Sequence, residues 1–233
     1  MFFGTITFGQ NVRIDTLDLK KSEQFNELQS DKMNFPIIRT GNKKIDSLIN
    51  SDLKNKFTSN EYPIESIETT LIKWADDRII YLDFEVTYNQ NGILSLNISA
   101  EGCGAYCTYW TDYYNYSVIS GKLLNISEIV DTTGEFNTRI YKDKEAQFQQ
   151  QKKELKEMLN DPDAELDQST YEWALEYYEN CENSFDLKSF AIYPDYIEII
   201  KRCYLPNAIK NLTPFLSFKY KKSEIKKYLK IKN

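Results

Sequence analysis

The chain contains no histidine among its 233 residues. Histidine is the usual general base near neutral pH and the commonest ligand of transition metals. Its absence excludes Ser-His-Asp and Cys-His catalysis, the HExxH zinc motif and most other zinc sites. Carboxylate pairs of the glycosidase type need only Asp and Glu, but with 35 acidic residues a pair can always be chosen, so such a pair is no specific signal. We therefore expect that the protein is not an enzyme.

Glycine and long apolar runs are also scarce. The eight glycines form no G-x-G-x-x-G or Walker pattern, which excludes the usual phosphate-binding loops. No stretch approaches the roughly 20 apolar residues of a membrane span, so no transmembrane segment is expected. Residues 161–172 place carboxylates as in a calcium loop, but Leu166 stands where that loop requires glycine. We expect no cofactor and no bound metal.

The composition is that of a folded, acidic protein. Hydrophobic residues make up 41% and aromatic residues 14% of the chain, which is enough to bury a core. A net charge of −6 argues against nucleic-acid binding, which needs a basic face, and is compatible with a basic protein partner. The length suits a single α+β domain over residues 1–233, or an N-terminal subdomain 1–75 that shares a core with a C-terminal subdomain 76–233.

The clearest local pattern predicts a β-hairpin. Apolar and polar residues alternate over 79–88 and again over 94–100, and the segment between them contains Asn91-Gly92. Upstream, we expect a short strand at 2–8, extended backbone at 35–38 and a helix capped by Asn42 that ends near Phe57. One face of the hairpin is predicted to be buried through Leu82, Phe84, Val86, Leu94, Leu96 and Ile98. The helix is predicted to bury Ile45, Leu48, Ile49, Leu53 and Phe57.

The second half alternates between helical and extended patterns. A short helix is expected near 127–130, a solvated helix over 142–159, and a helix that opens with a Ser169–Glu172 capping box and ends near Cys181. Strands are expected at about 187–192, 195–202 and 215–220, followed by a lysine-rich helix from Ser223. The fold class predicted is α+β, with an antiparallel sheet packed against amphipathic helices.

The strand expected at 105–119 is unusually aromatic. Tyr106, Trp110, Tyr114 and Tyr116 point to one face, while Tyr109 and Tyr113 point to the other. A sheet covered on one face can bury only one of these sets. The remaining aromatics either pack under a loop or form a recognition surface, with Trp110 as a candidate contact.

The helix near 169–181 is the best candidate for a partner-binding site. Residues 161–182 contain eight acidic residues and no Lys or Arg, interleaved with four aromatics. Carboxylates steer a basic partner, and aromatic side chains provide contact area. The alternative is a charged surface helix whose aromatics pack inward. The contacts predicted here are Glu172, Trp173, Glu176, Tyr177 and Glu179.

Three segments together resemble a known bacterial domain. They are 34–37 before an amphipathic helix, 115–124 at a strand end before a short helix, and 202–208 between two strands. Their order is similar to the extracytoplasmic domain of lysozyme-sensing anti-sigma factors, which also occurs beside peptidoglycan deacetylase domains. The chain departs from that family at 204–208, where the usual Pro-Tyr-Glu-Ile-Gly-Pro-Tyr-like run is reduced to Tyr-Leu-Pro-Asn-Ala.

The resemblance implies a non-catalytic α+β module of the cell envelope, some relatives of which bind lysozyme. The first residues lack the basic region of a signal peptide, so we expect a periplasmic or envelope-exposed protein if an export signal was removed, and a cytoplasmic one otherwise. An envelope location would favour oxidation of the four cysteines. The pairing with the shortest loops joins Cys103 to Cys107 and Cys181 to Cys203.

Two functions remain open at this point. The first is an immunity-type inhibitor or sensor that binds a basic protein, either a bacterial toxin or a lysozyme. The second is an envelope protein that binds glycan or peptidoglycan by stacking exposed aromatics on sugar rings. Salt should weaken the first kind of binding and hardly affect the second.

Overall fold

The computed structural model describes residues 11–19, 30, 32–76 and 79–231. The strand expected at 2–8 lies outside these residues. The described chain forms two compact units: the first runs to Asn125 and includes Ala191–Pro194, and the second comprises Ile126–Phe190 and Asp195–Ile231. Residue 75, the expected end of an N-terminal subdomain, lies inside the first unit. Antiparallel strands and helices are present throughout, which confirms the α+β class.

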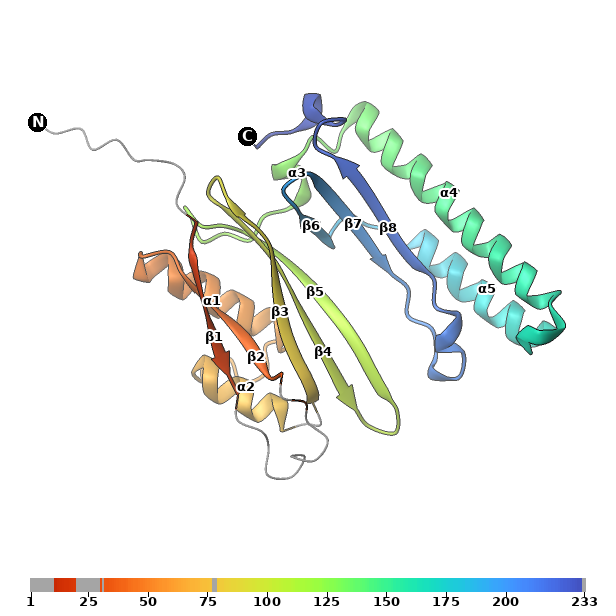
Figure 1. Cartoon of the computed structure of the whole chain (residues 1–233), viewed down its shortest axis with the longest axis horizontal. Coiled ribbons are helices and arrows are strands. Elements are labelled where there is room, and N and C mark those ends of the chain that lie inside the picture. The colour runs from red at the N-terminus through yellow and green to blue at the C-terminus, as the bar shows by residue number, and fades with distance from the viewer. Residues whose placement is uncertain (1–10, 20–29, 31, 77–78, 232–233) are drawn as a thin grey trace, which may run out of the picture. The chain divides into compact units, whose positions relative to one another are not determined.

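The first unit contains two antiparallel sheets and two helices (Figure 1). In chain order its elements are β1 (Arg13–Asp18), β2 (Asn34–Arg39), α1 (Lys43–Phe57), α2 (Ile67–Ala75), β3 (Ile79–Gln90), β4 (Ile93–Cys103) and β5 (Cys107–Ser117). β1 pairs with β2, and β3, β4 and β5 form a sheet with β4 in the centre. Helix α1 contacts β2 and β5, and α2 contacts β3, so the helices cover one face of the longer sheet.

The predicted hairpin is confirmed as β3 and β4. Asn91 and Gly92 have φ angles of 55° and 76°, the positive values that a tight two-residue turn requires. A Cβ on residue 92 would also lie 2.7 Å from the side chain of Ile119, so glycine is needed there for space as well. The register Gln90↔Ile93 closes the turn.

The core of the first unit lies on one face of the hairpin. Leu82, Leu94, Leu96 and Ile98 are fully buried, as expected. Phe84 and Val86 were expected to be equally buried but are only partly so, although they pack against the same core. Their strand, β3, is an outer strand of its sheet and has fewer neighbours than β4.

Helix α1 begins as the sequence predicts. The Asn42 side chain accepts hydrogen bonds from the backbone N–H groups of Lys44 and Ile45, which satisfies two donors of the first turn. Ile49, Leu53 and Phe57 are buried and Ile45 packs beside them. The prediction for Leu48 was wrong: it is 48% exposed, because it lies at the edge of the apolar stripe.

The second unit packs two helices beside the antiparallel strand pair β7 and β8 (Figure 1). Its main elements are α3 (Ile126–Ile129), α4 (Gly134–Leu159), α5 (Gln168–Asn183), β7 (Tyr196–Arg202) and β8 (Phe215–Lys221), with short 3₁₀ helices at 162–164, 207–212 and 226–228. The boundary between the units falls after Phe190, within the short strand β6 (Phe190–Ile192). Two contacts between aromatic rings connect the helices to β8. The ring centroid of Phe136 on α4 lies 5.0 Å from that of Tyr220, and the centroid of Phe185, just after α5, lies 5.6 Å from that of Phe218.

Two boundaries in this unit differ from the prediction. Helix α4 begins at Gly134 rather than near 142, since Phe136 and Ile140 are buried and extend its apolar stripe upstream. The lysine-rich end forms only a 3₁₀ turn, Lys226–Tyr228, instead of a helix from Ser223. Among the helices that the structure describes, none is both long and apolar enough to cross a bilayer.

Candidate partner-binding surface

Helix α5 is fixed to its unit along one side. Ala174, Tyr178 and Cys181 are buried on that side, and the Tyr178 hydroxyl donates a 2.6 Å hydrogen bond to the Leu212 carbonyl. A disulfide joins Cys181 to Cys203, the residue that follows β7. The opposite side of α5 is therefore presented on a firmly held backbone.

The cap of α5 differs from the predicted capping box. The N-terminal cap is Asp167, whose carboxylate accepts a 2.7 Å hydrogen bond from the Thr170 backbone N–H and a 2.9 Å bond from the Ser169 hydroxyl. These hydrogen bonds, with the Thr170 backbone bond the largest contribution, hold the pKa of Asp167 below its usual value. Ser169 thus supports the cap instead of providing it.

Replacing Asp167 with Asn should change how stability depends on pH. A carboxyl with a lowered native pKa contributes stability above its unfolded pKa, and this contribution is lost as the pH falls through the native value. Asn can cap a helix but does not titrate. The stability difference between the native protein and Asp167→Asn should therefore be largest above about pH 5 and shrink in acid. Denaturant titrations at several pH values would measure it, and a pH-independent difference would contradict the assignment.

The outer side of α5 carries exposed carboxylates and aromatic rings together. We call Glu172, Trp173, Glu176, Tyr177 and Glu179 the α5 acidic face. Its three glutamates are exposed, and none of them takes part in an ion pair among the described residues. Trp173 is 40% exposed, and its ring meets that of Tyr177 edge to face at 6.3 Å. The predicted contacts thus share one surface of one helix, except for Trp110.

Not all eight carboxylates of 161–182 are free to attract a partner. Glu182 is paired with Lys152 at 2.7 Å and with Lys144 at 3.6 Å, both on α4. Asp161 caps the 3₁₀ turn at 162–164, and Asp167 caps α5. The sequence count therefore overstates the unbalanced charge, because long-range pairs and caps cannot be read from local composition. What remains on α5 is the group of three exposed glutamates.

The structure adds one exposed aromatic residue that the sequence analysis did not select. Tyr204 is 75% exposed and directly follows Cys203, which the disulfide ties to Cys181 of α5. Its neighbour Leu205 packs against the same small core as Tyr177. The predicted Cys181–Cys203 pairing could have indicated this residue from the sequence, since the disulfide brings Tyr204 close to the last turns of α5.

Trp110 does not belong to this surface. It lies in the first unit, is half-buried, and packs edge-on against Trp74 with the ring centroids 6.2 Å apart. Its side chain packs against the core of the first unit, and its role as a partner contact stays a prediction. The exposed aromatics of the same segment are Tyr106 and Tyr109, at 62% and 55%.

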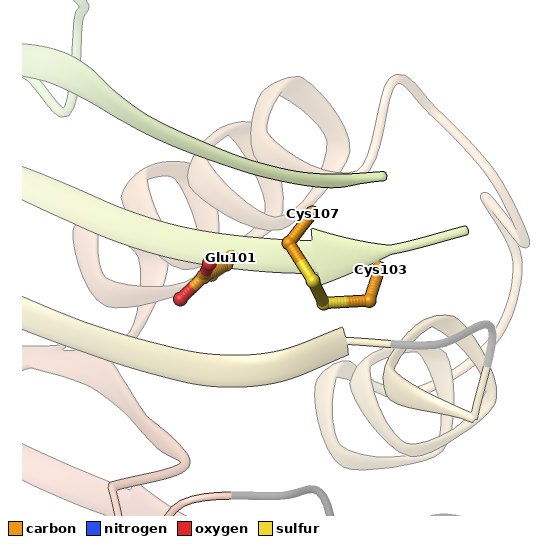
Figure 2. Close-up of side chains that lie close together, drawn as sticks. All are labelled: Glu101, Cys103 and Cys107. Atoms are coloured by element: carbon orange, nitrogen blue, oxygen red, sulfur yellow. A yellow bond between two sulfur atoms is a disulfide. The ribbon is translucent and has the colours of Figure 1, made fainter. Parts of the chain in front are cut away.

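Both predicted disulfides are present, and they restrict metal binding. Cys103 pairs with Cys107, and Cys181 with Cys203. Among the described residues, one group has ligand atoms close enough to hold an ion: Glu101, Cys103 and Cys107, whose atoms lie within 4.8 Å of one another (Figure 2). Both sulfurs are in the disulfide, so this group offers no thiolate, which is the form that binds metals. Only the Glu101 carboxylate remains as a ligand.

Comparison with known proteins identifies the fold. No protein-family model and no curated protein sequence matches the chain. Among solved structures, a member of the DUF3298 family from Bacteroides fragilis NCTC 9343 aligns over 94% of this chain and 95% of its own, with a TM-score of 0.56 and 13% identity. A DUF3298 protein from Pseudomonas aeruginosa PAO1 aligns over 95% and 93%, with a TM-score of 0.48 and 13% identity. The chain shares the fold of the Bacteroides protein; at this identity, the similarity concerns fold and not activity.

Proposed function

We propose that the protein is a non-catalytic binding module that captures a basic protein through the α5 acidic face. The observation that carries this proposal is the combination on one helix of three exposed glutamates with the exposed ring of Trp173, which meets the half-buried ring of Tyr177. Like charges at successive turns repel one another and lower helix stability. A cationic partner would relieve that repulsion.

The two kinds of side chain would act at different stages of binding. Glu172, Glu176 and Glu179 would attract a positively charged surface over several ångströms and raise the association rate. Trp173 and Tyr177 would then be desolvated at the centre of the interface and slow dissociation. The firm attachment of α5 through Tyr178 and Cys181 would reduce the entropy lost on binding.

The resemblance to lysozyme-sensing domains guides the choice of partner. A lysozyme, or a bacterial toxin whose immunity protein this would be, supplies the basic surface that the face requires. In either case the module would block or sense the partner by occupying its surface, which needs no catalytic group. Two disulfides fit an oxidising location such as the cell envelope.

Reversing the charge of Glu172, Glu176 and Glu179 to Lys should slow association with a basic partner by about tenfold or more at low salt. It should also flatten the dependence of the association rate on salt. Trp173→Ala should mainly speed dissociation and weaken binding by about 2 kcal/mol or more. Surface plasmon resonance at two salt concentrations would measure the association and dissociation rates, with lysozymes and the toxins encoded by neighbouring genes as candidate partners.

A matched control reverses three exposed carboxylates of the first unit, Glu61, Glu68 and Asp76. This variant changes the net charge by the same amount without touching α5. If both triple variants slow association equally, the effect comes from overall charge and the α5 acidic face is not the interface. Binding that withstands salt and is lost only with aromatic substitutions would support the alternative of glycan binding instead.

A further inference from the structure

A row of three side chains crosses the three-stranded sheet of the first unit. Tyr81 of β3, Glu101 of β4 and Tyr109 of β5 are directly opposite one another in the strand register. They lie on the face opposite the core, since Leu82 and Ala100, their neighbours in the chain, are fully buried. The two rings converge across the central strand, with centroids 6.0 Å apart and planes at 37°. Tyr109 is 55% exposed, while Tyr81 and Glu101 are half-buried.

Among the described residues, the two carboxylates nearest this row differ in their partners: Asp83 is paired and Glu101 is not. The next acidic residue on the same face, Asp83, accepts hydrogen bonds from Lys32 at 3.0 Å and from Asn34 at 3.3 Å. Glu101 takes part in no ion pair among residues 11–19, 30, 32–76 and 79–231. Glu101 lies on the strand between the two strands that carry the tyrosines, and its carboxylate makes the local potential negative, as do the faces of the aromatic rings.

The end of the sheet that carries the row is cross-linked. Cys103 and Cys107 face each other in the register directly beyond Glu101 and Tyr109, and they are joined by a disulfide. Figure 2 shows the disulfide and the Glu101 carboxylate on the same side of the sheet. The cross-link limits the motion of β4 against β5, so Glu101 and Tyr109 are held at a fixed separation before any ligand arrives.

We propose that Tyr81, Glu101 and Tyr109 form a binding site for a lysine or arginine side chain of a peptide or protein. The cationic group would lie over the rings, within about 6 Å of a ring centroid, and pair with the Glu101 carboxylate. The methylene stem of the side chain would cover ring surface that is now exposed. Burial raises the pKa of Tyr81, so its phenol stays neutral beside the Glu101 carboxylate.

This site belongs to the first unit and does not depend on the α5 acidic face, which belongs to the second. The two surfaces share a preference for cations, so their tests must separate them. The site can therefore fail while the proposed function holds, and the reverse is also possible.

The test uses the full chain and a tri-arginine peptide with blocked termini as the probe. Tyrosine ring signals in NMR, assigned through Tyr81→Phe and Tyr109→Phe, should shift and saturate as the peptide is added. Glu101→Gln should weaken binding about fivefold, the effect of a partly exposed cation–π and ion-pair contact. Glu85→Gln, which removes a charge from the same sheet face two rows away, should leave the affinity unchanged. Replacing Tyr81 and Tyr109 together with Leu should abolish the saturable shift of the neighbouring signals of this sheet, such as the Glu101 backbone amide.

Three results would overturn the proposal. The first is equal weakening by Glu101→Gln and Glu85→Gln, which would reveal a general charge effect. The second is loss of peptide binding on substitution of Glu172, Glu176 and Glu179 by Gln, with no effect of Glu101→Gln; this would favour the α5 acidic face instead. The third is saturable binding of a neutral chito-oligosaccharide at the two tyrosines without binding of the peptide. Circular dichroism of each variant would show that the fold is retained, and Glu101→Gln tests the site even if the leucine variant unfolds.

Discussion

Replacing Phe35 with Ala is expected to lower the free energy of unfolding of the first unit by about 3–5 kcal/mol. Phe35 is completely buried in β2, and its ring packs against that of Phe57 at 5.7 Å. Phe57 in turn contacts Trp74 at 4.9 Å, so tryptophan fluorescence reports on this core directly. Denaturant unfolding in a Trp173→Phe background would confine the signal to the described tryptophans of the first unit, Trp74 and Trp110.

Phe84→Ala provides the matched control. It removes the same side chain from the same unit, but Phe84 is only half-buried on the outer strand β3. Phe84→Ala should therefore lower the free energy of unfolding clearly less than Phe35→Ala, because it exposes less buried apolar surface and leaves a smaller cavity. Equal destabilisation by the two substitutions would mean that Phe84 is packed in the core as closely as Phe35, which contradicts their difference in burial.

The parts of the fold that the sequence predicted are those set by local chemistry. The hairpin of β3 and β4 follows from alternation and an Asn91-Gly92 turn, and the start of α1 follows from the Asn42 cap. Strand β1 could not be predicted in the same way. Its sequence, RIDTLD, carries few apolar residues, and it is a strand because residues 13–18 pair with residues 34–39, which come later in the chain. Such pairing depends on tertiary context more than on local propensity.

The same distinction applies to the candidate sites. The α5 acidic face lies on one helix, so helical spacing alone was enough to place its residues together. The Tyr81–Glu101–Tyr109 row depends on the register of three strands. An irregularity in the pairing between Ile79 and Tyr81 decides which side chains of β3 face the core. A shift of one residue would move Tyr81 to the buried face. Sequence patterns do not show such irregularities, and they did not show that Trp110 packs on Trp74.

Removing the Cys181–Cys203 disulfide should have the second large effect on stability. The bond closes a loop of 22 residues in the chain, and constraining such a loop in the unfolded state contributes about 3 kcal/mol. The double variant Cys181→Ala, Cys203→Ala should lose about that amount, measured by denaturant unfolding of the second unit through Trp173 fluorescence. Both cysteines are buried, so the substituted side chains also leave a small cavity that adds to the loss.

The Cys103–Cys107 disulfide is the control within the same chain. It closes a separation of only four residues, at a position where the register already pairs its two strands, so its removal should cost less, about 2 kcal/mol at most. The two variants should also differ in binding. Loss of Cys181–Cys203 frees the end of α5 and Tyr204, so capture of a basic protein by the α5 acidic face should weaken, whereas loss of Cys103–Cys107 should affect only the tyrosine row of the first unit. If both variants weaken binding of the same probe equally, the disulfides act through general stability and not by fixing separate surfaces.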